Sequence, residues 1–330
     1  MFKKIIFSNS FIFFMSIIII TILLEVTLRF LGFEPWTYIK QDLNEPITNQ
    51  YHPKIGWKPK EGIYIFPPFS KNGKYTKFTI LKDGSRFSGK ISGDSEVDVL
   101  FIGGSFTQGW AVDDQETFPW FFQKKLPNLK VKNYGVGGYG TYQSFLLLEE
   151  ILKKKNNIKI IIYSYIKAHP SRNIGDASWL SYLNKYSRRG HLSLPYVELD
   201  KNGNLIEHEP VEYLKLPFRE YSALITRLEK KIMRIKLYSK YKDKTKITQK
   251  IILEMKKLSE KNGSKFIFAN LDSVKDDLIP YIEFSKKNKI TFTDCGYTDV
   301  TDDYIVENDG HPNHKMHKLY ADCIYNIVFN

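Results

Sequence analysis

The stretch VLFIGGSFTQG, which runs from Val99 to Gly109, constrains the fold of this chain more than any other segment. Its first residues are apolar and mostly β-prone, which is typical of a strand that is buried on both faces. The strand passes directly into Gly103, Gly104 and Ser105, and the glycines permit a tight turn and a close approach to a substrate. Because ligands bind at the carboxyl ends of strands in open α/β sheets, the sequence predicts that the Ser105 hydroxyl lies at a functional edge.

Strand and helix patterns alternate from position 98 onward, which indicates βαβ units and a parallel sheet. We expect strands at 98–102, 130–133, 159–165, 265–269 and 291–295. We expect helices at 116–125, 142–155, 247–262, 278–288 and 312–328. The predicted fold class is therefore α/β, with a three-layer, doubly wound (flavodoxin-like) parallel sheet and one N-terminal transmembrane helix.

A second motif, DGHPN at 309–313, supplies an acid and an imidazole near the end of the chain. Histidine suits the task of a general base because its ordinary pKa lies near neutrality, and an adjacent acid fixes its tautomer. Asp309 and His311 are close enough for one loop to deliver both to Ser105, provided that the two segments meet at the rim of the sheet. Pro312 suits the first position of the last helix, where its missing N–H costs nothing.

Three blocks of the chain resemble the SGNH hydrolases, the GDSL-type esterases. The blocks are VLFIGGSFTQGWAVDDQETFP at 99–119, VKNYGVGGYGTYQS at 131–144 and NDGHPNHKMHKLYAD at 308–322. The resemblance extends from about position 98 to the C-terminus. It implies that Ser105 is the nucleophile, His311 the base, Asp309 the acid that orients it and Gly138 an oxyanion donor.

The chain also departs from the pattern of this family. Gly104 stands where the family name implies an aspartate. The usual Asp-x-x-His spacing is shortened to Asp309-x-His311, with Asn308 in the more usual position of the acid. The role of the acid is therefore left open by the sequence, because Asp309 would approach the imidazole from a different angle.

The third block of the family, Gly-x-Asn-Asp after a strand, is replaced here by KAHPSRN at 167–173. His169 occupies the place of the asparagine, and its imidazole N–H would join the backbone N–H groups of Ser105 and Gly138 as an oxyanion donor. Gly104 and Asn133 complete the set of candidate oxyanion and substrate-binding residues.

Other interpretations of these motifs are weaker. Gly-Gly-Ser and Asp-Gly are also common turn sequences. The segment NYGVGGYG lacks the glycine spacing of a nucleotide-binding loop, and Thr107 breaks the Gly-x-Ser-x-Gly elbow of α/β-hydrolases. His311, His314 and His317 recur every three residues, but Pro312 separates His311 from the helix that carries the others. We therefore expect no metal, no cofactor and no nucleic acid.

The N-terminus carries a candidate membrane anchor. Lys3 and Lys4 precede an uncharged stretch of twenty residues from Ile5 to Leu24, enough to span a bilayer. No small-residue cleavage site follows, which favours an uncleaved, single-pass signal anchor. The two lysines predict a cytoplasmic N-terminus and a catalytic domain on the periplasmic or extracytoplasmic side.

Three regions are expected along the chain: the anchor at 1–32, a lead-in segment at 33–95 that packs on the catalytic domain, and an SGNH hydrolase-like domain at 96–330. The last contains an insertion at about 172–246, which either forms a wall of the substrate site or is a surface excursion.

The lead-in and the insertion contain their own short elements. Strands are expected at 62–66 and 78–81, and a hairpin with strands at 196–199 and 205–208. A charged helix is expected at about 220–237.

The formal net charge of +13 would suit anionic partners such as lipid head groups or acidic polysaccharide. Because the lysines are spread evenly, a general compositional bias is the favoured explanation. Cys295 and Cys323 are the two cysteines, and the sequence permits either one disulfide or two buried thiols.

The sequence as a whole predicts a membrane-anchored serine esterase acting on O-acyl, chiefly O-acetyl, esters of cell-envelope glycans through an acyl-enzyme. The alternatives are a glycan O-acetyltransferase with the same site, a lipid-directed esterase or thioesterase, and a catalytically silent glycan-binding homologue. The expected partners are an acylated glycan or another small ester, and the lipid bilayer.

Overall fold

The computed structural model describes residues 9–37, 45–69, 73–89, 98–154, 157–185, 192–237, 243–272, 275–297 and 300–329. The start of the predicted anchor, with Lys3 and Lys4, lies outside the described residues, as does Lys155 at the end of a predicted helix.

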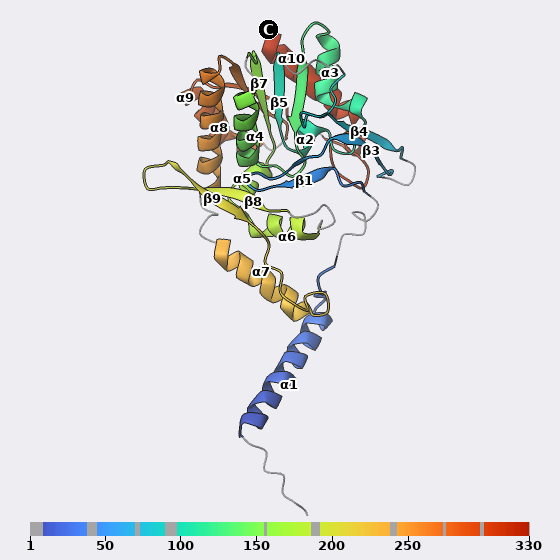
Figure 1. Ribbon diagram of the computed structural model, residues 1–330, viewed down its shortest axis with the longest axis vertical. Helices are drawn as coiled ribbons and strands as arrows, with labels where there is room; N and C mark the ends of the chain where they lie inside the picture. Colours follow the sequence, from blue (N-terminus) through green and yellow to red (C-terminus); the bar gives the residue numbers. More distant parts are fainter. Residues whose placement is uncertain are drawn as a thin grey trace, which may run out of the picture.

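A five-stranded parallel sheet forms the centre of the molecule, in the order β11-β10-β7-β5-β6 (Figure 1). Its strands are β5 (Val99–Gly103), β6 (Val131–Gly135), β7 (Ile160–Tyr165), β10 (Lys265–Asn270) and β11 (Thr291–Asp294). Counted along the chain, this is the order 2-1-3-4-5 of flavodoxin-like folds, which confirms the predicted fold class. Each predicted strand of this central sheet is found, with its ends shifted by at most two residues.

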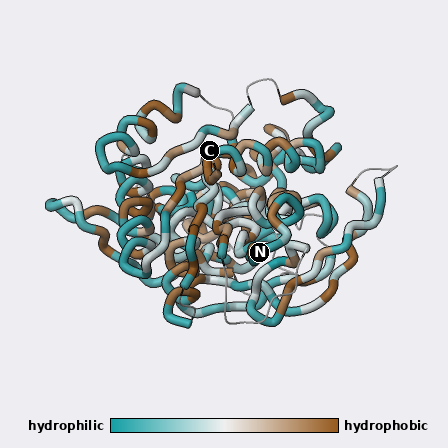
Figure 2. Tube along the Cα trace, turned by 90° about the horizontal axis from the view of Figure 1, so that it is seen from above, coloured by the Kyte–Doolittle hydropathy of each residue, from teal (hydrophilic) through white to brown (hydrophobic). Residues whose placement is uncertain are grey.

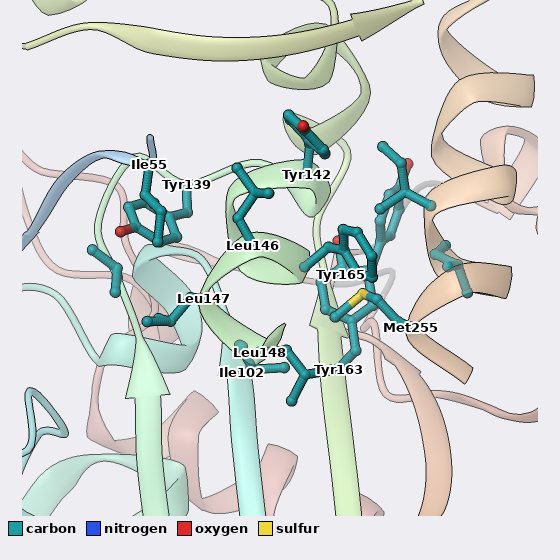
Figure 3. Packing of buried hydrophobic residues seen from close by; sticks show 14 of the residues in the cluster. Ile55, Ile102, Tyr139, Tyr142, Leu146, Leu147, Leu148, Tyr163, Tyr165 and Met255 are labelled. Carbon is teal, nitrogen blue, oxygen red and sulfur yellow. The ribbon is translucent and has the colours of Figure 1, made fainter. Parts of the chain in front are cut away.

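Helices cover both faces of this sheet. One face carries α4 (Thr141–Lys154), α8 (Lys244–Lys261) and α9 (Lys275–Lys287), and the other carries α3 (Phe118–Lys125) and α10 (His314–Phe329). Successive residues of a strand point to opposite faces, so Ile102 packs under α4 while Phe101 packs under α3. Figure 3 shows the cluster of buried side chains on the α4 side of the sheet, in which Leu148 of α4 lies beside Ile102 of β5. Seen from above, hydrophilic segments dominate the outer rim (Figure 2).

The last helix begins two residues later than predicted. Asn313 Oδ1 accepts the backbone N–H of Lys315 at 3.0 Å, so an asparagine caps the helix and Pro312 lies outside it. Pro312 instead forms an isolated bridge with Ile305, because the fixed φ of proline also suits an extended backbone. This bridge holds the loop that carries His311.

The lead-in forms two short antiparallel pairs, β1 (Asn49–His52) with β2 (Gly56–Pro59) and β3 (Gly62–Phe66) with β4 (Thr76–Ile80). Several contacts join it to β6 and to the loop that follows β6. The backbone N–H of Arg86 donates to the carbonyl of Asn133 at 2.8 Å, and Trp57 Nε1 donates to the carbonyl of Gly137 at 3.2 Å. The boundaries of the three regions stay a prediction.

The insertion contains the expected hairpin, β8 (Leu194–Leu199) with β9 (Leu205–Val211), and the expected helix α7 (Ala223–Leu237). Two helices that were not predicted lie at its start: α5 (His169–Asn173), which crosses the predicted boundary at about 172, and α6 (Ala177–Lys185). A short segment that starts with Ala-His-Pro offers too little apolar periodicity to predict a helix.

Two further features concern the ends of the chain. Helix α1 (Asn9–Phe30) extends away from the rest (Figure 1), and its stretch Ser10–Phe30 is long and apolar enough to cross a membrane. Cys295, which follows β11, and Cys323 in α10 form a disulfide, so the structure decides between the two alternatives that the sequence left open.

Candidate active site

Ser105 lies at the carboxyl end of β5, as the first residue of the short helix α2 (Ser105–Gln108). Its side chain is almost fully buried, and Oγ lies 2.9 Å from Nε2 of His311. The two segments, far apart in sequence, therefore meet at the rim of the sheet as expected. This contact is within the reach that proton transfer between a hydroxyl and an imidazole requires.

Asp309 lies on the other side of the imidazole. Its Oδ1 is 2.6 Å from Nδ1 of His311 and also accepts the backbone N–H of His311 at 3.2 Å. Gly310, with a φ of +82°, allows the tight turn that brings both side chains of the loop together. Asp309 rather than Asn308 therefore contacts the imidazole, and the catalytic roles of these residues stay a prediction.

Trp110 is a site residue that the sequence analysis missed. Its Nε1 donates to Oδ2 of Asp309 at 3.2 Å, and its ring packs against Phe66 with centroids 5.1 Å apart. Burial alone would raise the pKa of Asp309, but the hydrogen bonds and charge of His311 and the bond from Trp110 lower it below its ordinary value. The carboxylate therefore stays ionised, which favours a proton on Nδ1 of His311 and leaves Nε2 to accept one from Ser105.

Gly138 lies beside Ser105 in the loop after β6, with a φ of +83°. A Cβ at this position would lie 3.0 Å from the Trp57 ring and 3.3 Å from the Trp179 ring, and the positive φ also favours glycine here. Gln108 Oε1 holds the loop by accepting the backbone N–H of Gly137 at 2.8 Å. Among the described residues, the backbone N–H groups of Ser105 and Gly138 have no hydrogen-bond acceptor, so both can donate to an oxyanion.

His169 is not where the sequence analysis expected it. The side chain is fully buried behind Gly104 and does not line the cavity; its Nδ1 lies 2.7 Å from the Tyr163 hydroxyl. A Cβ at Gly104 would come within 2.7 Å of Nε2, so this glycine makes room for the imidazole instead of contacting a substrate. Burial, and then the charge of Arg172, hold the pKa of His169 well below its ordinary value, so the ring is neutral.

Asn133 also lies away from the cavity lining. It is fully buried in β6, where its Oδ1 accepts the backbone N–H of Gly135 at 3.0 Å. Its carbonyl oxygen accepts the backbone N–H of Arg86. Asn133 therefore stabilises the edge strand of the sheet. Its position does not support the predicted contact with a substrate.

A cavity of about 390 Å³ opens beside Ser105, Gly138, Asp309 and His311. Most of the other residues that line this cavity were not predicted from the sequence, among them Glu45, Asn49, Trp57, Arg172, Trp179 and Tyr182. Arg172 follows β7, whose carboxyl end adjoins that of β5, and this topology is the signal that could have placed it near Ser105. Since Arg172, Trp179 and Tyr182 belong to the insertion, the insertion contributes a wall of the cavity. The described residues contain no group of three or more His, Cys, Asp or Glu side chains that could hold a metal ion.

No family model matches this chain, and no curated protein matches its sequence. Solved structures do match it. A member of the lipolytic G-D-S-L family from Veillonella parvula is 11% identical, covers 71% of this chain and 98% of its own, and has a TM-score of 0.40. The psychrotrophic esterase EstA from a Pseudoalteromonas species is 10% identical, covers 71% of this chain and 100% of its own, and has a TM-score of 0.41. These similarities are too slight to carry an argument about the function of this chain.

Proposed function

We propose that this chain is a membrane-anchored serine esterase that acts on O-acyl, chiefly O-acetyl, esters of cell-envelope glycans through an acyl-enzyme. The observation that carries this proposal is the unbroken contact from Ser105 through His311 to Asp309. It lies at the carboxyl edge of the sheet, beside two backbone N–H groups that have no acceptor among the described residues.

The proposed reaction has two stages, the formation of the acyl-enzyme and its hydrolysis. His311 Nε2 takes the proton of Ser105 while Oγ attacks the ester carbonyl, and the N–H groups of Ser105 and Gly138 stabilise the negative oxygen. The C–O bond to the sugar then breaks, and His311 returns its proton to the sugar oxygen. A water molecule, deprotonated by the same imidazole, releases the acid and restores Ser105.

The shape of the cavity supports a small acyl group on a sugar. Its volume of about 390 Å³ lies near the lower end of the range for small-molecule sites, which favours an acetyl group over a long acyl chain. Tyr182, which is 47% exposed, offers a flat aromatic face against which the apolar face of a sugar ring can pack, and Asn49 offers a polar group in the same cavity.

Two features support an extracytoplasmic location on a single-pass anchor. Helix α1 has the length and the apolar composition of a membrane span. The disulfide between Cys295 and Cys323 is typical of an oxidising compartment, because the cytoplasm keeps thiols reduced. Alkylation of the protein in intact cells tests this location: free thiols at both cysteines would contradict it.

Labelling with a fluorophosphonate probe tests the enzyme class. The full chain, purified in detergent, should react with the probe, and Ser105→Ala should abolish the labelling without unfolding the protein. A folded wild-type protein that does not react would overturn the proposal in favour of a silent glycan-binding protein.

Product analysis tests the substrate class. Acetate released from an acetylated glycan in water supports hydrolysis. Turnover that occurs only when an acceptor sugar is present would contradict it and indicate a transferase. Activity that rises with acyl length would likewise contradict the glycan ester and indicate a lipid-directed enzyme.

A further inference from the structure

Arg172 is a cation that the proposed chemistry does not use, although it lines the same cavity as Ser105. Its Nη1 donates to the carbonyl oxygen of Tyr139 at 2.9 Å, and its guanidinium carbon lies 4.2 Å from the centroid of the Trp179 ring. These two contacts fix the orientation of the guanidinium plane. A Cβ at Gly104 would lie 3.6 Å from Nη1, so the charge lies next to the residue that precedes Ser105.

The charge of Arg172 is not neutralised within the described part of the protein. No carboxylate there lies within 4.0 Å of the guanidinium, and Nε is buried without a hydrogen-bond partner. Glu45 and Asp309 line the cavity as well, and Asp309 is paired with His311. A buried cation without a partner is costly, and a bound anion would remove that cost.

Arg172 nevertheless stays positively charged at neutral pH. Burial lowers its pKa to about 10, while the phenols of Tyr163 and Tyr182 act in the opposite direction. A value of about 10 leaves the group protonated under physiological conditions.

We propose that Arg172 forms an anion-binding subsite of the proposed esterase, in which the guanidinium pairs with a carboxylate or phosphate carried by the glycan beside the ester that Ser105 attacks. Guanidinium suits this task because its planar set of donors matches carboxylate and phosphate oxygens. The net charge of +13 would draw such anionic substrates toward the protein. The subsite assignment rests on the proposed esterase function and names its substrate class: acidic glycans that carry O-acyl esters.

Paired substrates test this subsite. We compare methyl glucuronoside with methyl glucoside, each carrying one O-acetyl group, and acetylated glucose 1-phosphate as a phosphate-bearing substrate. The wild-type protein should prefer a charged substrate by about 10- to 100-fold in kcat/KM, mainly through KM, as expected for hydrogen bonds to a charged group. The arm that shows the preference identifies the anion as a carboxylate or a phosphate.

Arg172→Gln should lower kcat/KM for the charged substrate most and bring the ratio of charged to neutral turnover close to one. Lys167→Gln is the matched control, since it removes an exposed positive charge from the same segment outside the cavity and should keep the ratio. Equal turnover of charged and neutral substrates by the wild-type protein would overturn the subsite. A loss in Arg172→Gln that is the same for both substrates would overturn it too.

Inhibition of the wild-type protein keeps the test valid if Arg172→Gln does not fold. Methyl glucuronoside or glucose 1-phosphate should compete with 4-nitrophenyl acetate at lower concentration than methyl glucoside does, and equal inhibition by all three contradicts the subsite. Fluorophosphonate labelling separates the two proposals: a protein that labels but shows no preference for anions is an esterase without this subsite.

A second, independent observation concerns helix α7, which lies across the end of α1 (Figure 1). Glu25 of α1 accepts the backbone N–H groups of Ala223 and Leu224, each at 2.9 Å, and so caps α7. Arg29 donates to the carbonyl oxygen of Tyr221 at 2.8 Å. These bonds hold α7 level with the last turns of the candidate membrane span.

The outer face of α7 carries an apolar stripe that faces solvent. Leu228, Ile232 and Ile235 are 47%, 37% and 68% exposed, and their spacing places them on one side of the helix. Lys231 and Arg234 are exposed beside the stripe. This pattern is typical of a helix that lies in the interface of a bilayer with anionic head groups.

We infer that the outer face of α7 rests on the bilayer that α1 spans, as a second membrane contact. The inference depends on the proposed anchoring by α1. It commits to a lipid surface because α7 is hydrogen-bonded to the last turns of the candidate membrane span. In the full chain the two native cysteines are paired, so Ile232→Cys can be labelled alone with an environment-sensitive fluorophore. Ile279→Cys, on the exposed face of α9, is the matched control.

The protein is reconstituted in nanodiscs of phosphatidylcholine with phosphatidylglycerol. The emission at position 232 should shift to the blue and resist a soluble quencher, while that at position 279 should do neither. Equal exposure of both positions in nanodiscs would overturn this inference. Failure of the protein to enter nanodiscs at all would instead overturn the anchoring by α1.

Discussion

The carboxylate of Asp309 is shared between the imidazole of His311 and the indole of Trp110. The indole N–H therefore competes for the same negative charge that holds the imidazole in place, and it also fixes the direction of the carboxylate. At this scale the proposed function depends on single hydrogen bonds, each of which can be removed by one substitution.

Trp110→Phe should lower kcat about tenfold with little change in KM, because a hydrogen bond to a charged acceptor contributes about 1.5 kcal/mol. The pKa of Asp309 should rise toward its ordinary value once this donor is lost. Trp120→Phe makes the same chemical change in α3, outside the cavity, and should not alter kcat. Steady-state kinetics on 4-nitrophenyl acetate measure both variants, and equal kcat values for the two would contradict the role of Trp110.

Gly104 and His169 form a pair in which the missing side chain of one makes room for the other. Gly104→Ala should lower the free energy of unfolding by about 1–3 kcal/mol, because its Cβ would come within 2.7 Å of a buried imidazole nitrogen. In a double-mutant cycle with the shorter His169→Asn, the double variant should be more stable than the sum of the single effects predicts. Urea denaturation measures the cycle. As a control, the effects of Gly104→Ala and the exposed Lys167→Gln should be additive. If the effects of Gly104→Ala and His169→Asn are additive too, the two residues are not coupled.

At the scale of whole elements, Arg86 connects the lead-in to the loop after α2. Its fully buried guanidinium lies 3.2 Å from Asp114 Oδ1, donates to the carbonyl oxygens of Gln108 and Val112 at 2.9 and 2.7 Å, and also contacts that of Gly109. One side chain thus supports the backbone that follows Ser105. The shape of the active site depends in this way on a segment that carries none of the proposed catalytic groups.

Arg86→Met should lower the free energy of unfolding by about 3–5 kcal/mol, because it leaves Asp114 buried without its cation. Activity should fall as well, since the loop behind Ser105 loses its support. Adding Asp114→Leu should recover part of the stability but not the activity. Denaturation and kinetics on the three proteins measure these effects; a single variant within 1 kcal/mol of wild type would show that the ion pair does not hold the loop.

His317 affects the stability of the whole molecule through its protonation. It is fully buried in α10, where its Nδ1 accepts the backbone N–H of Phe118 at 3.2 Å. Burial, followed by the charges of Arg86, His311 and His314, lowers its pKa from 6.5 to about 3. Between these two values the unfolded chain binds a proton that the folded protein does not, so stability falls as the pH falls.

The free energy of unfolding should therefore decrease from pH 6.5 toward pH 3, with His317 contributing up to about 1.4 kcal/mol per pH unit. His317→Gln keeps an acceptor for Phe118 but cannot gain the proton, so its stability should depend less on pH in this window. Urea denaturation at pH 7 and pH 4.5 compares the two proteins. An identical pH dependence would show that His317 is not responsible.

Local patterns in the sequence were enough to predict the sheet. The apolar runs of β5, β7 and β10 and the glycines after β5 are short-range signals, and the resulting fold class and strand positions are confirmed. The two segments that carry Ser105 and His311 could also be identified, because each combines a turn with a reactive side chain. The start of the last helix was predicted wrongly. Pro312 was expected at its first position, but Asn313 caps the helix and Pro312 lies outside it.

The sequence by itself determined the strands of the central sheet and the helices that cover them, the candidate membrane span and the residues predicted to act on an ester. Only the tertiary structure decided that Trp110 bonds to Asp309, that His169 lies behind Gly104, that Arg172 lines the cavity and that Cys295 meets Cys323. The physical reason is that hydrophobic periodicity depends on residues a few positions apart, whereas a hydrogen bond, a steric gap or a buried charge depends on segments that become neighbours only when the chain folds.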